Sequence, residues 1–464
     1  MSPAAPRKHP DQTGRVWIAL CFLLAAAIRI GFVLAFPTIH GGDAAARLAH
    51  ADTLVLGYQL PLPQLFVILG KAASDDPVVV RLFFCLWGAI LAAGLTALLA
   101  LVLDSRAALF GGLLLAFDPL LVHYSIVPYQ EPVAYGLVAW AFYFAASSRV
   151  GLGSLLMGAA CLCRYETWLF LPFFAWTSGA PRVAALAGVP VLGWIWWWRG
   201  LAPGGLYVLD IDAGASRFSR VSYLTGKFLE YETALPLALA ALAFLLATRA
   251  TARALILFTT TLALVIAIVI ALGHEYPPGS GLMSERLIHL PVLACIVLSA
   301  GALARVGERS RPAFAACLAV ALVLAGRNIR FETALLRAAA KDPDLALARD
   351  VARALDEALA AGECVTVAAP PVDPALLQAY VSKVGASFGD VDRARARAVE
   401  LATSSPDRDR IAAHLRAGIG TVRAEPGCPL LVIVDEAQTA PASATPVAEI
   451  RAGPRRARVL RIPR

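Results

Sequence analysis

Charged residues are scarce in this chain of 464 residues: 16% are Asp, Glu, Lys or Arg, whereas 59% are hydrophobic. Globular domains carry about a quarter charged residues, so the composition does not fit a soluble protein, and the mean hydropathy of +0.68 agrees. Apolar segments of about 20 residues, the length that crosses a bilayer, recur through the first two-thirds of the sequence. We therefore expect a polytopic α-helical membrane protein.

Other absences narrow the class further. No basic patch interleaved with stacking aromatics accompanies the net charge of +8, and the arginines lie mostly between apolar runs, as the positive-inside rule predicts; nucleic acid is therefore not an expected partner. No cleavable signal peptide is evident, because Arg7, Lys8 and Arg15 precede an apolar run at 16–36 that is too long for a signal h-region. We interpret this run as a signal anchor.

The apolar pattern predicts about 11 membrane spans. Two of them, 151–163 and 167–177, are short, and together they are either one broken helix or two tilted ones. The expected spans are residues 16–36, 78–103, 107–124, 130–146, 151–163, 167–177, 183–198, 234–248, 254–272, 287–304 and 313–326.

The expected organisation has three parts. Residues 1–15 are a cytoplasmic N-terminus, residues 16–330 a transmembrane module with outer loops at 37–77 and 199–233, and residues 331–464 a soluble domain. In that domain predicted helices alternate with short apolar strands, which is typical of a small α/β domain; it carries no Gly-rich phosphate loop and no nucleophile elbow. The predicted helices are residues 344–361, 374–384, 393–403 and 408–417, and the predicted strands are residues 364–369, 430–435 and 457–462. Threading from a cytoplasmic N-terminus places the domain on the periplasmic face of the inner (plasma) membrane.

The same threading gathers the unusual polar residues on the outer face. Asp43 follows two glycines directly after the first span, where an ionisable residue is a functional-site hypothesis; the alternative is an N-cap for a helix beginning at Ala44. The four polar clusters are the loop of Asp43 and Tyr58, the turn from His123 to Glu131, the segment Arg164 to Glu166, and the segment from His274 through Arg286 to His289.

Carboxylates and arginines at a bilayer edge suit one particular task. A carboxylate can take a proton from an incoming hydroxyl, as general-base catalysis requires. Arginines can bind the phosphate of a lipid-linked substrate whose tail stays in the bilayer, because the guanidinium fork matches phosphate oxygens. The alternative is that these residues are ordinary charges at helix ends.

The order of these features resembles the GT-C superfamily of membrane glycosyltransferases, especially its protein O-mannosyltransferase and aminoarabinose-transferase-like branch. The resemblance covers about residues 10–330 and rests on the Gly-Asp-Ala of residues 42–44, the Gly-Tyr-Gln-Leu-Pro-Leu-Pro-Gln-Leu of residues 57–65, the acidic turn at 124–132 and the basic segment at 164–166. Two positions depart from the family pattern: Ala44 stands where many members have Glu, and Leu62 separates the paired prolines.

The resemblance implies an inverting glycosyltransferase with a sugar on a polyprenyl phosphate as donor and a protein, lipid or glycan as acceptor. By that analogy Asp43 is the catalytic base, Glu131 a supporting carboxylate, and Arg164 or Arg286 the contact to the lipid phosphate. The other expected substrate or phosphate contacts are Tyr58, His123, Glu166 and His274.

Several alternatives stay open. We expect no metal, although His40 with Asp43, or His274 with Glu275, could hold a divalent ion. A transporter or flippase of lipid-linked sugars is the second functional reading, but transporters usually show internal repeats and no clear repeat is present. A third reading is a scaffold whose tail binds partners.

Two cysteines in the tail predict a disulfide. Cys364 precedes the apolar run Val365–Ala369, and Cys428 precedes Leu430–Val434. If these runs are neighbouring parallel strands, both cysteines lie at the same end of the sheet, within reach of a disulfide. An oxidising compartment outside the membrane would preserve that bond.

Overall fold

The computed structural model describes residues 12–37, 39, 42–49, 51, 54, 60–74, 76–201 and 288–358, together with strands at 365–368, 386–387, 430–435, 445–452 and 455–462. The chain divides into two compact units. The first comprises residues 1–35, 53–70 and 80–334, and the second comprises residues 36–52, 71–79 and 335–464.

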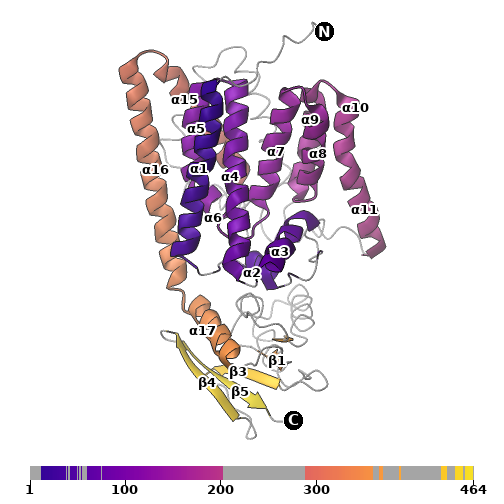
Figure 1. Ribbon diagram of the computed structural model, residues 1–464, viewed down its shortest axis with the longest axis vertical. Coiled ribbons are helices and arrows are strands. Elements are labelled where there is room, and N and C mark those ends of the chain that lie inside the picture. The colour runs from indigo at the N-terminus through magenta and orange to yellow at the C-terminus, as the bar shows by residue number, and fades with distance from the viewer. Residues whose placement is uncertain are drawn as a thin grey trace, which may run out of the picture. The chain divides into compact units, whose positions relative to one another are not determined.

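The first unit is a helical bundle (Figure 1). Its long helices are α1 (Gln12–Ala35), α4 (Pro77–Val102), α15 (His289–Gly307) and α16 (Arg311–Ala340), with the ends of α4 and α16 assigned to the second unit. Among the described residues these four are long and apolar enough to cross a membrane. The shorter elements are α3 (Pro61–Ala73), α5 (Ser105–Phe117), α6 (Pro119–His123), α7 (Glu131–Ala146), α8 (Val150–Cys161), η1 (Tyr165–Leu169), α9 (Phe170–Ser178), α10 (Pro181–Ala184), η2 (Ala185–Gly188) and α11 (Val189–Leu201).

Small residues allow these helices to approach closely, as is usual for helices that pack in membranes. Helix α5 packs against both α1 and α15. A Cβ atom on Gly112 of α5 would lie 2.8 Å from Cys21 Sγ of α1, and that thiol contacts the Gly112 carbonyl oxygen at 2.9 Å. Helices α7 and α4 are joined by Trp140, whose Nε1 donates to the carbonyl oxygen of Ile90 at 3.0 Å.

The bundle departs from the predicted spans in one instructive place. The predicted span at 107–124 is not one continuous helix, because α5 ends at Phe117 and α6 begins at Pro119. Asp118 caps the new helix by accepting the N–H of Leu121 at 2.9 Å, and Pro119 lacks the N–H that a continuous helix needs. The predicted spans 234–248 and 254–272 lie outside the described residues, so the span count stays a prediction.

The second unit contains a five-stranded sheet with strand order β2-β1-β3-β5-β4. Strands β2 (Ala386–Ser387), β1 (Val365–Ala368) and β3 (Leu430–Asp435) are parallel, whereas β5 (Arg455–Ile462) is antiparallel to both β3 and β4 (Thr445–Ala452). Helix α17 (Pro343–Ala358) packs on β4 and β5. The predicted helices at 374–384, 393–403 and 408–417 lie outside the described residues.

Helix α2 (Gly42–Ala49) also belongs to the second unit. Because it begins at Gly42, Asp43 lies inside its first turn and is not the N-cap that one interpretation of the sequence expected. The predicted boundary at residue 331 falls inside α16, whose residues continue as a helix to Ala340, and the division between the units comes after Ala334.

Candidate active site

Three of the predicted site residues form one buried ion cluster, the Glu131–Arg164–Glu166 triad. Arg164 Nη1 donates to Glu131 Oε1. Its Nε donates to Glu166 Oε2 at 3.0 Å, and its Nη2 donates to Glu166 Oε1. All three guanidinium nitrogens are therefore engaged by carboxylates, in the forked geometry that makes such pairs strong.

The triad carries one more negative charge than positive charge. The side chains of Arg164 and Glu131 are 6% and 1% exposed, while that of Glu166 is 21% exposed. Burial disfavours the charged guanidinium, but Glu166 and Glu131 outweigh burial and hold the pKa of Arg164 well above its ordinary value. The arrangement can thus hold a carboxylate at a fixed place in a site that excludes most water.

Local structure explains how these side chains reach one another. Glu131 is the first residue of α7, where a carboxylate is favoured by the N-terminal end of the helix dipole. Arg164 lies in the turn between α8 and η1. Thr167 fixes that turn, because its Oγ1 contacts the carbonyl oxygens of Ala160 at 3.0 Å and Arg164 at 2.6 Å.

The Pro-Leu-Pro segment at residues 61–63 of the predicted first outer loop lies beside this turn. The N–H of Leu62 in α3 donates to the carbonyl oxygen of Leu162 at 3.0 Å. Leu60 and Trp194 are buried together, with Tyr165 and Leu162 packed against them. The structure therefore brings the segment around Leu62 and the triad's turn together, as a shared site requires.

A second polar pair lies elsewhere in the same unit, and the sequence predicted only one of its members. His123, the last residue of α6, has its Nδ1 atom 3.0 Å from Oε1 of Glu332 in α16. The His123 side chain is 19% exposed and the Glu332 side chain 1%. Glu332 was not predicted, although Asn328 and Glu332 are four residues apart and both buried, a spacing that marks one helix face.

Aromatic rings connect the two clusters. The Tyr124 ring contacts the rings of His123 and His289, with centroid separations of 5.5 and 4.6 Å. The ring of His289 in turn lies 6.0 Å from that of Tyr135 in α7, and Tyr135 follows Glu131 of the triad by four residues in the same helix, a spacing that places both on one helix face. The triad and the His123–Glu332 pair are therefore parts of one connected region.

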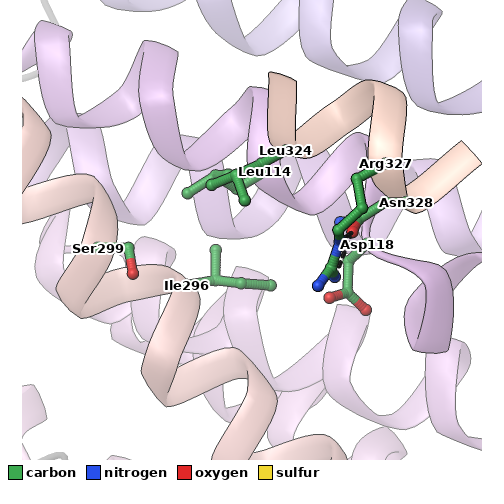
Figure 2. Close-up of a pocket in the computed structure, with 7 residues that line it drawn as sticks. All are labelled: Leu114, Asp118, Ile296, Ser299, Leu324, Arg327 and Asn328. Atoms are coloured by element: carbon green, nitrogen blue, oxygen red, sulfur yellow. Dashed lines mark hydrogen bonds between the residues drawn. The ribbon is translucent and has the colours of Figure 1, made fainter. Parts of the chain in front are cut away.

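A small cavity lies where α5 and α6 meet α15 and α16 (Figure 2). Asp118, Arg327 and Asn328 gather at one end of it, and Leu114 with Leu324 line another part. Its volume is about 20 Å³, room for about one water molecule. This cavity is too small for a sugar or a phosphate and does not extend the candidate site.

The remaining predicted residues are placed less completely. Asp43 lies in α2 of the second unit, whereas Tyr58, His274, Arg286, Cys364 and Cys428 lie outside the described residues. Within the described part of the chain, no group of three His, Cys, Asp or Glu side chains could hold a metal ion. In Figure 1, α2 and α3 are helices of the predicted first outer loop, and α7 begins at the predicted acidic turn.

Comparison with solved structures identifies the fold. ArnT, an aminoarabinose transferase from Cupriavidus metallidurans, matches in its apo state with a TM-score of 0.64 and 13% identity over 96% of this chain and 98% of ArnT. The same protein bound to undecaprenyl phosphate matches with a TM-score of 0.63 and 14% identity over the same shares, 96% and 98%. The apo oligosaccharyltransferase of Archaeoglobus fulgidus matches with a TM-score of 0.50 and 12% identity over 91% of this chain and 70% of that protein.

These similarities are structural, because no family model and no curated protein sequence matches the chain. They span nearly the whole length of both this chain and ArnT. The chain therefore has the fold of the GT-C superfamily, the class of membrane glycosyltransferases that the sequence features resemble.

Proposed function

We propose that this protein is an inverting glycosyltransferase that moves a sugar from a polyprenyl-phosphate-linked donor to an acceptor outside the plasma membrane. The observation that carries the proposal is the buried Glu131–Arg164–Glu166 triad, set in a fold shared end to end with a transferase that has been solved with undecaprenyl phosphate. A fold alone does not define a function, but a buried, charge-rich site between apolar helices is costly to keep without a use.

In the proposed reaction, Asp43 takes the proton of an acceptor hydroxyl while the acceptor oxygen attacks the anomeric carbon of the sugar. The bond between that carbon and the phosphate oxygen breaks, and its electron pair leaves with the polyprenyl phosphate. Deprotonation by a positioned carboxylate contributes about 10²- to 10⁴-fold in rate.

The triad sharpens the roles expected from the sequence. Arg164 was expected to bind the lipid phosphate, but its three nitrogens bond carboxylates. We therefore assign Arg164 to holding Glu131, the supporting carboxylate, in place. The phosphate contact then falls to other candidates, namely Arg286 and His123.

The leaflet in which a donor lipid accumulates separates this function from a flippase. A deletion strain lacking a transferase accumulates its sugar-linked lipid in the outer leaflet, whereas one lacking a flippase accumulates it in the cytoplasmic leaflet. Membrane-impermeant periodate, applied to spheroplasts, oxidises only outward-facing sugars. We expect the accumulated lipid to be oxidised in intact spheroplasts; protection until lysis would favour the flippase.

The tail tests the proposed orientation. Strands β1 and β3 are parallel neighbours with Thr366 opposite Leu430, and Cys364 and Cys428 each precede these residues by two positions in the sequence. We assign a disulfide to this pair, on the outer face. A membrane-impermeant thiol reagent should label the tail of intact cells only after reduction, and labelling only after lysis would place the tail in the cytoplasm.

A further inference from the structure

Glu332 is a buried carboxylate in the bundle that the proposed reaction does not yet use. Its side chain is 1% exposed, and its Oε1 atom lies 3.0 Å from Nδ1 of His123. Its other oxygen, Oε2, has no hydrogen-bond partner in the described part of the chain. Burying a carboxylate costs more than a single weak contact returns, so stability alone is a poor reason for its presence.

The contact fixes the state of the histidine ring. An ionised carboxylate only accepts hydrogen bonds, so Nδ1 of His123 donates to Glu332. In the imidazolium form Nε2, the ring nitrogen that faces away from Glu332, also carries a proton that it can donate. Carboxylates orient histidines in this way in catalytic and metal-binding sites, where the second ring nitrogen does the work. His123 is partly exposed, at 19%, and Glu332 is not, which is the order expected of a binding residue and its support.

The position of His123 indicates what it binds. The rings of Tyr124 and His289 connect it to Tyr135, which lies about one turn after Glu131 of the triad in α7. The triad itself has an excess negative charge, so it cannot stabilise the phosphate that departs from the sugar. A phosphate bound in this region needs a hydrogen-bond donor from outside the triad.

We infer that Glu332 is a positioning residue that holds His123 as an imidazolium, whose Nδ1–H is donated to Glu332 and whose Nε2–H is donated to the phosphate of the lipid-linked donor. This inference rests on the proposed function, because it names the part of the substrate that one portion of the site recognises. Glu332 acts through His123 and does not itself contact the lipid.

Binding of undecaprenyl phosphate to the full-length protein in lipid nanodiscs tests this assignment. We expect His123→Ala and Glu332→Ala each to weaken binding by about 10-fold, the scale of one hydrogen bond to a charged group. The double variant should bind no worse than His123→Ala, because Glu332 has nothing left to position. Glu332→Gln keeps an acceptor oxygen for Nδ1 and should stay within about 3-fold of the wild type, on the scale of a weaker neutral hydrogen bond.

Glu308→Gln is the matched control, since Glu308 is 41% exposed and pairs with Arg305 at the loop between α15 and α16; it should bind like the wild type. The inference is overturned if Glu332→Ala weakens lipid binding by the same factor in the wild type and in the His123→Ala background. It is also overturned if His123→Ala binds the lipid like the wild type. If Glu332→Ala does not fold, the Glu332→Gln and His123→Ala arms decide, and a 10-fold loss in Glu332→Gln overturns positioning by hydrogen bonding. If the wild-type protein binds no undecaprenyl phosphate, both the proposed function and this inference are contradicted.

Discussion

Two of the buried arginines in the helical unit, Arg29 and Arg164, are held in opposite ways. Arg29 of α1 is fully buried, and its Nη1 donates to the carbonyl oxygens of Ala25 and Ala116, each at 3.1 Å. Arg164 instead bonds two carboxylates through three nitrogens. The carbonyl of Ala116 lies in the last turn of α5, where backbone acceptors lack partners, so Arg29 completes a helix end.

Under the proposed function, this difference separates a structural arginine from one that belongs to the active site. Arg29 donates hydrogen bonds to backbone carbonyl oxygens, one of them at the break between α5 and α6. Its role is therefore structural. Arg164 gathers carboxylates that have no packing reason to be close, and its task is to keep charged oxygens in place. Substitutions at the two positions should therefore differ in both the size and the kind of their effects.

The largest effect is expected from Arg164→Ala. It leaves Glu131 and Glu166 close together without a cation, and removing one partner from a buried ion pair costs about 3–5 kcal/mol. We expect a markedly lower unfolding temperature in detergent together with loss of sugar transfer. Arg164→Lys should recover part of the stability but little transfer, because an ammonium lacks the fork. Wild-type transfer in Arg164→Ala would make the triad irrelevant to function.

Glu131→Gln should follow in size. Its side chain is 1% exposed, against 21% for Glu166, so water can compensate Arg164 more easily when Glu166 changes. We expect Glu131→Gln to reduce sugar transfer by about 10-fold, the scale of one lost charged hydrogen bond, and Glu166→Gln to reduce it less. Initial rates for the two variants, measured at matched expression, make the comparison; a larger loss in Glu166→Gln would contradict the assignment of Glu131.

Gly88→Ala probes the space around Arg29. A Cβ there would lie 2.5 Å from Arg29 Nε and 2.4 Å from Ser125 Oγ, so one of these groups must move, at a cost of about 1–3 kcal/mol. Gly31→Ala on α1 is the control, because nothing lies within 4 Å of its added methyl group. The unfolding temperature should fall only for Gly88→Ala. Equal unfolding temperatures of the two variants would mean that the space between Gly88, Arg29 and Ser125 can accept a methyl group.

Arg29→Met should have the smallest effect. Methionine fills much of the same space, and the principal loss is one hydrogen bond to a helix end, worth about 1 kcal/mol. We expect slightly reduced stability and unchanged affinity for undecaprenyl phosphate. A loss of affinity as large as that of His123→Ala would assign Arg29 to the binding site and erase the contrast with Arg164.

Part of this structure could be predicted from sequence periodicity and composition. Strand β3 has the bounds that were predicted for a strand, 430–435, and the predicted helix 344–361 ends within a few residues of the end of α17. Long apolar runs identify α1, α4 and α15 for the same reason: burial in lipid or in a sheet demands a continuous pattern. The break between α5 and α6 was also predictable, because an Asp-Pro pair favours the start of a new helix. It was missed because the run of apolar residues continues on both sides of that pair.

The partners of the site could not be predicted. Glu131 and Arg164 are 33 residues apart, and His123 and Glu332 are 209 apart. A helical repeat predicts neither of these separations along the sequence, because each pair forms only when separate helices pack together. Glu332 was also concealed by its surroundings: residues 327–340 look soluble in composition, yet they continue α16 as a helix with one buried face.

The most direct test of the proposed function is sugar transfer by Asp43→Asn, measured beside expression level and undecaprenyl phosphate binding. Asparagine keeps the size of the side chain and its capacity to accept hydrogen bonds, but it cannot take a proton from the acceptor. The account predicts that transfer falls by about 10²-fold or more, while expression and lipid binding stay at wild-type levels. Transfer close to the wild-type rate would contradict Asp43 as the general base and with it the proposed mechanism.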